Sequence, residues 1–109
     1  MRRIAVLLLA GLSACGYPEP RLDLYYIRGM SRKEVLRRDP DPIESHKLDR
    51  PPRDARADRF LYDIEVETGQ RPAFYDLYLR SLSSYGAWGD YVFYDPDGLL
   101  LGARRVPLD

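Results

Sequence analysis

The chain has 109 residues, with 17 basic and 17 acidic side chains and a single cysteine. A formal net charge of zero gives no electrostatic argument for binding nucleic acid, and one cysteine excludes an internal disulfide framework. A chain of this length is expected to form one small domain and not two.

The first residues have the layout of an export signal. Two arginines precede an unbroken apolar run at 4–10, and small residues stand directly before Cys15. A charged start followed by an apolar segment of about 7–15 residues is typical of a secretory signal, whereas a membrane-spanning helix needs about 20 apolar residues. We therefore expect a signal peptide at residues 1–14.

The end of this signal, Leu12-Ser13-Ala14-Cys15, resembles the lipobox of bacterial lipoproteins. The resemblance implies cleavage before Cys15, a diacylglycerol on its thiol and an acyl chain on the new amino terminus, with no other cofactor. Gly16 stands where an Asp would resemble an inner-membrane retention signal, which favours the periplasmic face of the outer membrane. The alternative is an ordinary signal peptide and an accidental cysteine, which would carry a free thiol into an oxidising compartment.

A lipidated tether at residues 15–20 is predicted to precede one α+β domain at 21–109, because the two prolines of the tether disfavour both helix and strand pairing. Residues 21–27 are apolar at every second position, which fits a short strand or an extended lead-in. Ser31 followed by Glu34 is a capping box and predicts the start of a helix. The prolines at 40 and 42 predict that this helix ends after two turns.

The remaining segments predict a loop, a second helix and three strands. Residues 43–53 are polar and proline-bearing, which indicates a loop. Residues 53–68 have apolar side chains at helical spacing before Gly69, although a strand-like alternation is also present, and we favour a helix. Strands are expected over 73–82, 90–94 and 99–106. The sequence Asp95-Pro96-Asp97-Gly98 suits a type I turn with a glycine bulge between the last two strands.

Two stretches resemble the SmpA/OmlA (BamE-like) family of small outer-membrane lipoproteins. They are Ile27-x-Gly29-Met30-Ser31-x-x-Glu34-Val35 and the hairpin from Tyr91 to Leu100. The resemblance implies two helices followed by a three-stranded antiparallel sheet, and a binding or scaffolding role, including one in outer-membrane protein assembly. Relative to this family, Ser45–Arg59 is an arginine-rich insertion.

The residue types that catalysis usually requires are sparse. His46 is the only histidine, so a zinc site or a Cys/His nucleophile pair cannot be assembled, and we interpret it as a solvated loop residue. No Gly-rich phosphate loop and no Gly-x-Ser-x-Gly motif is present. We therefore expect neither an enzyme nor a metal site. The alternative is a periplasmic enzyme or a small-ligand-binding lipoprotein that uses an aromatic groove.

Aromatic residues are abundant, with nine tyrosines, three phenylalanines and one tryptophan. Phe74, Tyr91 and Phe93 are expected in the core. Tyr85 and Trp88 lie among small residues, which predicts a surface loop before the central strand. Because tyrosine and tryptophan are frequent interface anchors, these two side chains are the predicted partner-binding residues. The expected partners are the membrane, through the lipid anchor, and an envelope protein.

Overall fold

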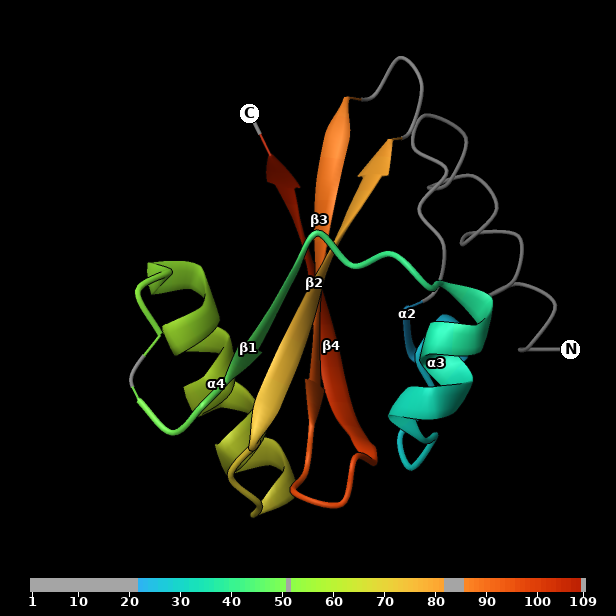
Figure 1. Cartoon of the computed structure of the whole chain (residues 1–109). Coiled ribbons are helices and arrows are strands. Elements are labelled where there is room, and N and C mark those ends of the chain that lie inside the picture. Colours follow the sequence, from blue (N-terminus) through green and yellow to red (C-terminus); the bar gives the residue numbers. More distant parts are fainter. Residues whose placement is uncertain (1–21, 51, 82–85, 109) are drawn as a thin grey trace, which may run out of the picture.

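The protein folds into an antiparallel sheet with helices on both faces (Figure 1). The computed structural model describes residues 22–50, 52–81 and 86–108. In chain order the elements are α2 (Leu22–Tyr25), α3 (Arg32–Arg38), β1 (Glu44–Lys47), α4 (Ala55–Thr68), β2 (Phe74–Ser81), β3 (Ala87–Tyr94) and β4 (Leu100–Leu108). The strands are ordered β1-β2-β3-β4 across one sheet. The predicted α+β class is confirmed.

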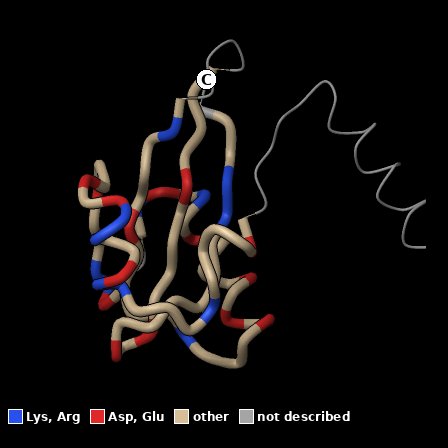
Figure 2. Tube along the Cα trace, turned by 90° about the vertical axis from the view of Figure 1, so that its right-hand side faces the viewer, with Lys and Arg blue, Asp and Glu red and all other residues tan. Residues whose placement is uncertain are grey.

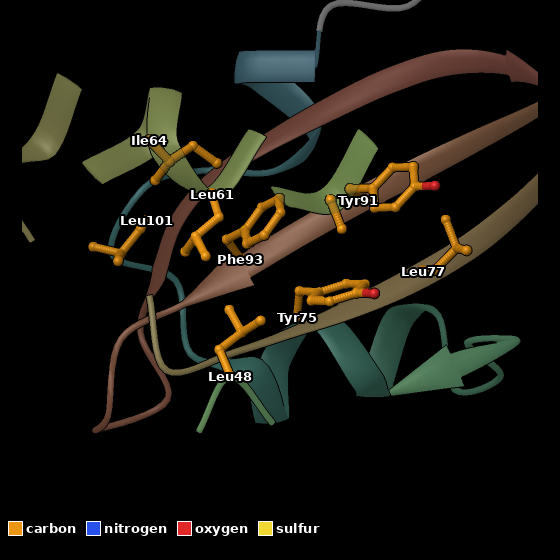
Figure 3. Packing of buried hydrophobic residues seen from close by; sticks show 9 residues of the cluster. Leu48, Leu61, Ile64, Tyr75, Leu77, Tyr91, Phe93 and Leu101 are labelled. Atoms are coloured by element: carbon orange, nitrogen blue, oxygen red, sulfur yellow. The ribbon is translucent and has the colours of Figure 1, made fainter. Parts of the chain in front are cut away.

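Each face of the sheet carries its own apolar cluster, because successive residues of a strand point to opposite faces. The α4 cluster, shown in Figure 3, consists of Leu48, Ala57, Leu61, Ile64, Tyr75, Leu77, Tyr91, Phe93 and Leu101. The α2/α3 cluster on the other face consists of Tyr26, Val35, Tyr78, Val92, Tyr94 and Leu100. The core positions predicted for Tyr91 and Phe93 are confirmed, while Phe74 is partly buried against the second cluster.

The two longer helices begin and end at the residues that favour their termini. The Ser31 hydroxyl accepts a hydrogen bond from the backbone N–H of Glu34 at 3.1 Å, and α3 stops before the prolines. Asp54 caps α4 by accepting from the N–H of Arg56 at 2.9 Å. The helix ends at Gly69, whose φ of 72° is the left-handed conformation that glycine adopts at low cost. Both predicted helices are confirmed, and the strand alternative for 53–68 is wrong.

The predicted β3–β4 hairpin is also present. The carboxylate of Asp95 accepts hydrogen bonds from the backbone N–H groups of Asp97 and Leu99, each at 2.9 Å. Gly98 has a φ of 82°, and the strand register shifts at Phe93/Tyr94. These features fit the type I turn and bulge that the sequence predicts.

Two segments differ from the prediction. The sheet has four strands, because β1 lies within the expected loop and pairs with β2 from Glu44↔Leu77 to Lys47↔Phe74. All four β1 side chains are exposed, so backbone pairing forms this strand without an apolar alternation. The expected strand or lead-in at 21–27 is instead the short helix α2, where Tyr26 N–H donates to Leu22 O at 2.7 Å. The predicted order of two helices and then three strands is therefore incomplete.

Candidate functional site

Trp88 does not lie in a surface loop. It belongs to β3, opposite Arg80 of β2 and Pro107 of β4, and is 7% exposed. β3 begins at Ala87, three residues before the predicted start, so the expected loop position is wrong. Tyr85 and Cys15 lie outside the described residues. The partner-binding roles of Tyr85 and Trp88 and the lipidation of Cys15 stay predictions.

Sequence reasoning missed a group of charged side chains buried under α2 and α3. Asp90 of β3 is fully buried and accepts from Arg105 of β4 through Nε at 2.6 Å and Nη2 at 2.8 Å. The same carboxylate accepts from Arg80 Nε at 3.3 Å and from the Tyr26 hydroxyl at 2.7 Å. Figure 2 shows acidic and basic positions along the strands as well as on the helices. One carboxylate thus joins Tyr26, the residue after α2, to three strands.

This network continues to the end of α3. Arg80 Nη2 donates to the Tyr26 hydroxyl at 2.7 Å and lies 3.2 Å from the Asp39 carboxylate. Tyr25 donates its hydroxyl proton to Asp39 at 2.7 Å. Burial alone would raise the pKa of Asp39, but the hydrogen bonds from Tyr25 and Arg80 hold it below its ordinary value. The network therefore holds α2 and α3 against the sheet.

A second buried carboxylate, Asp76 of β2, connects α3 with the edge strand. Arg32 donates to it through Nε at 2.8 Å and Nη2 at 3.0 Å, a bidentate geometry. The Ser45 hydroxyl of β1 donates to the same carboxylate at 2.6 Å. The hydrogen bond to Asp76 raises the pKa of the Arg32 guanidinium. Every donor to Asp76 and Asp90 comes from the domain itself. Both carboxylates therefore have a structural role, because they connect neighbouring elements of the fold.

A cleft of about 570 Å³ lies between β1 and the start of α4. Its volume lies within the range of about 300–1,000 Å³ that is usual for small-molecule sites. It is lined by Glu44, His46, Lys47, Leu48, Asp49, Arg50, Pro52, Arg53, Asp54 and Tyr75. Much of the arginine-rich insertion Ser45–Arg59 therefore borders this cleft. The insertion is the one feature of the sequence that could have indicated the cleft.

The buried side chain of Tyr75 is one of the residues that line the cleft. Burial, with the nearby carboxylates of Asp54 and Glu44, raises the pKa of Tyr75 to about 12. His46 lies on β1, with its ring centroid 5.0 Å from that of Tyr75 and its Nε2 2.6 Å from Glu44 Oε1. His46 therefore belongs to a strand, so the loop interpretation is wrong, whereas the expected exposure of its side chain to solvent is confirmed.

Two pairs of apolar side chains are exposed on opposite sides of the molecule. Tyr62 and Val66 lie one turn apart on α4 and are 67% and 66% exposed. Leu24 of α2 and Ile27 just after it are 67% and 50% exposed. Large exposed apolar residues that are close together indicate contact surfaces. The sequence does not distinguish either pair, because the apolar residues of both pairs fit the helical or alternating pattern of their segment.

Comparison with known proteins does not assign this chain to a family. The sequence matches no protein-family model, no curated protein and no solved structure. Within residues 22–50, 52–81 and 86–108, no helix is both long and apolar enough to span a membrane. The fold thus defines a small α+β domain with helices on both faces of its sheet, and the resemblance to the SmpA/OmlA family stays a prediction.

Proposed function

We propose that this chain is a lipid-anchored envelope lipoprotein that acts as a non-catalytic protein-binding module. The observation that carries the anchor is the sequence Leu12-Ser13-Ala14-Cys15 at the end of a short apolar signal. Outer-membrane protein assembly is the setting that the SmpA/OmlA resemblance implies. In this proposal the domain lies on the periplasmic face of the outer membrane and needs neither a metal nor a nucleic acid.

Replacement of the proposed acylated residue tests the anchor. Because acylation needs the thiol, Cys15→Ser is expected to abolish incorporation of labelled fatty acid and to leave an unprocessed or soluble precursor. Ser13→Ala keeps a small residue before the cleavage point and serves as the matched control, with labelling retained. Normal labelling and membrane retention of Cys15→Ser would contradict the lipoprotein assignment.

The outer side of α4 is the best-supported protein-binding surface. Tyr62 and Val66 stand on the helix face that points away from the α4 cluster, and the exposed Arg59 precedes Tyr62 by one turn. Tyrosine and arginine are among the residues that contribute most to protein interfaces. The helix also carries four acidic against two basic side chains, which favours a partner with a basic rim.

Site-specific crosslinking in intact envelopes tests this surface. A photoreactive residue in place of Tyr62 is expected to give a discrete crosslinked protein, and Val66→Asp in the same chain is expected to abolish that product. The same photoreactive residue in place of Ile43, which is 53% exposed and lies outside α4, is the control. Identical products from both positions would show that α4 is not the binding surface.

The cleft between β1 and α4 supports a second candidate function, the binding of a small ligand. It brings His46, Glu44 and the hydroxyl-bearing ring of Tyr75 together in a volume of about 570 Å³. A thermal-shift screen with phosphate, amino acids and sugars would detect such a ligand as a rise in melting temperature. Tyr75→Phe keeps the buried ring and removes only the hydroxyl, so a true ligand is expected to lose its effect on this variant.

A further inference from the structure

The exposed side chains Leu24 and Ile27 are fixed in their outward position by the buried network. Their neighbour Tyr26 is buried and donates to Asp90, and Tyr25 donates to Asp39. The guanidinium of Arg38 lies 4.0 Å from the ring centroid of Tyr25, and Arg38 Nη2 donates to the Tyr25 carbonyl at 2.7 Å. With the two tyrosines held against the sheet, Leu24 and Ile27 cannot turn inward without breaking these contacts.

The charges around this apolar pair are predominantly basic. Residues 22–39 hold five basic side chains (Arg28, Arg32, Lys33, Arg37 and Arg38) and three acidic ones (Asp23, Glu34 and Asp39), and Arg32, Arg37 and Arg38 form ion pairs with Asp76, Glu34 and Asp39. Arg28 and Lys33 are exposed, and neither forms an ion pair with another of the described residues. The acidic helix α4 lies on the opposite face of the sheet (Figure 1). The side that carries Leu24 and Ile27 thus has an excess of exposed basic side chains, and helix α4 has an excess of acidic ones.

The position of α2 in the chain brings this side close to the proposed anchor. Seven residue steps lead from Cys15 to Leu22, and at 3.3–3.6 Å per residue they span at most about 25 Å. For comparison, helix α4 is about 21 Å long at about 1.5 Å per residue, so the tether is close in length to one dimension of the domain. The acylated residue therefore keeps α2 within one domain diameter of the bilayer.

From these observations we infer that the α2 side of the domain lies on an anionic lipid surface, with Leu24 and Ile27 in the interfacial layer and Arg28 and Lys33 at the head groups. Exposed apolar side chains next to basic ones have the chemistry of interfacial membrane contact. This inference rests on the proposed acylation of Cys15. It leaves the α4 surface facing away from the membrane, where a protein partner can reach it.

Depth-dependent fluorescence on the full acylated chain tests the orientation. Because Cys15 is blocked by its acyl group, the thiol of Leu24→Cys is the only one that a polarity-sensitive dye can label. In vesicles of phosphatidylethanolamine with phosphatidylglycerol, we expect a blue-shifted emission that brominated lipid quenches. Val66→Cys carries the same dye at an equally exposed position on α4, and we expect a water-like emission without quenching there.

The outcomes separate the inference from the proposed function. A chain that does not float with vesicles and whose Cys15 peptide lacks the acyl mass would overturn the anchor. A chain that floats, with equal and water-like emission at positions 24 and 66, would overturn the orientation. Ile27→Cys gives a second labelled position in case Leu24→Cys fails to fold. Arg28→Glu with Lys33→Glu is expected to reduce the quenching at position 24, and unchanged quenching would overturn the role assigned to the basic side chains.

Discussion

Asp90 shows how a side chain that looks like a surface residue in the sequence serves the interior. Strand residues next to apolar neighbours are normally assigned to a solvated face when they are charged, yet Asp90 is fully buried and surrounded by donors from Tyr26, Arg80 and Arg105. A buried ion pair is tolerated only when its hydrogen-bonding groups are satisfied with good geometry. The bidentate contact with Arg105 satisfies both oxygens of Asp90 and raises the pKa of the arginine, whereas the buried Nη1 of Arg105 has no hydrogen-bond partner among the described residues.

Removal of the charge at this position is expected to be severely destabilising. Asp90→Asn leaves the buried guanidinium of Arg105 without a counter-charge, and breaking a buried pair costs about 3–5 kcal/mol of unfolding free energy. Glu65→Gln is the control, because Glu65 pairs with Arg71 at 3.4 Å on the surface and is expected to lose about 1 kcal/mol or less. Urea denaturation of both variants measures the difference, and equal midpoints would contradict a structural role for Asp90.

Trp88 is expected to behave as a core residue. Its side chain is 7% exposed between β2 and β4, so Trp88→Ala should lower the unfolding free energy by about 3–5 kcal/mol. Tyr62→Ala removes a ring of which most is exposed and should change stability by about 0.5 kcal/mol or less. If calorimetry shows Trp88→Ala to be as stable as the original chain, the tryptophan is available for a partner after all.

At the scale of elements, the sequence predicts those whose signals are local. The cap at Ser31, the prolines after Asp39 and the Asp95–Gly98 turn each act within a few residues, and the structure confirms all three. β1 was missed because Glu-Ser-His-Lys has no apolar alternation, and it becomes a strand only by pairing with a segment about 30 residues away. α2 has four residues, too few for a helical period to be distinguished from an alternating one.

The candidate sites depend even more on distant segments. The cleft requires β1 and Tyr75 to be neighbours, and the exposed pairs are recognised only once the buried faces are known. Trp88 was misplaced because Gly86 and Gly89 suggest a turn, whereas Gly89 lies within β3 opposite Leu79 and Val106. Pairing with two neighbouring strands outweighs the local preference of glycine.

The start of α3 provides a test of a local signal. Ser31→Ala removes the acceptor for the Glu34 N–H and should lower stability by about 1 kcal/mol. For a domain of this size, the expected fall in melting temperature is about 4–8 °C. Ser31→Asp keeps a good capping oxygen and should retain most of the stability. Equal melting temperatures for the Ala and Asp variants would show that the cap does not stabilise α3.

At the scale of the whole molecule, coverage of the sheet on both faces determines the chemistry of the interior. A sheet with one solvated face would leave the tyrosines of that face in water. Here α4 encloses Tyr75 and Tyr91 of the sheet. On the other face α2 and α3 enclose Tyr78 and Tyr94 of the sheet, together with Tyr26, which follows α2. Burial is the main reason why the pKa of each of these five tyrosines is raised. The pKa reaches about 12 for Tyr75 and for Tyr78.

The raised tyrosine pKa values predict cooperative alkaline unfolding. An unfolded tyrosine releases its proton near pH 10.0, whereas the folded domain holds these protons to higher pH. The folded state therefore binds more protons above pH 10, so the stability contribution is fully present below that pH and is lost as the pH rises toward about 12. Absorbance of tyrosinate at about 295 nm should rise together with the loss of far-ultraviolet circular dichroism as the domain unfolds. Full ionisation of the tyrosines with the circular dichroism unchanged would show that their hydroxyls are accessible in the folded state, which would contradict the burial of these side chains.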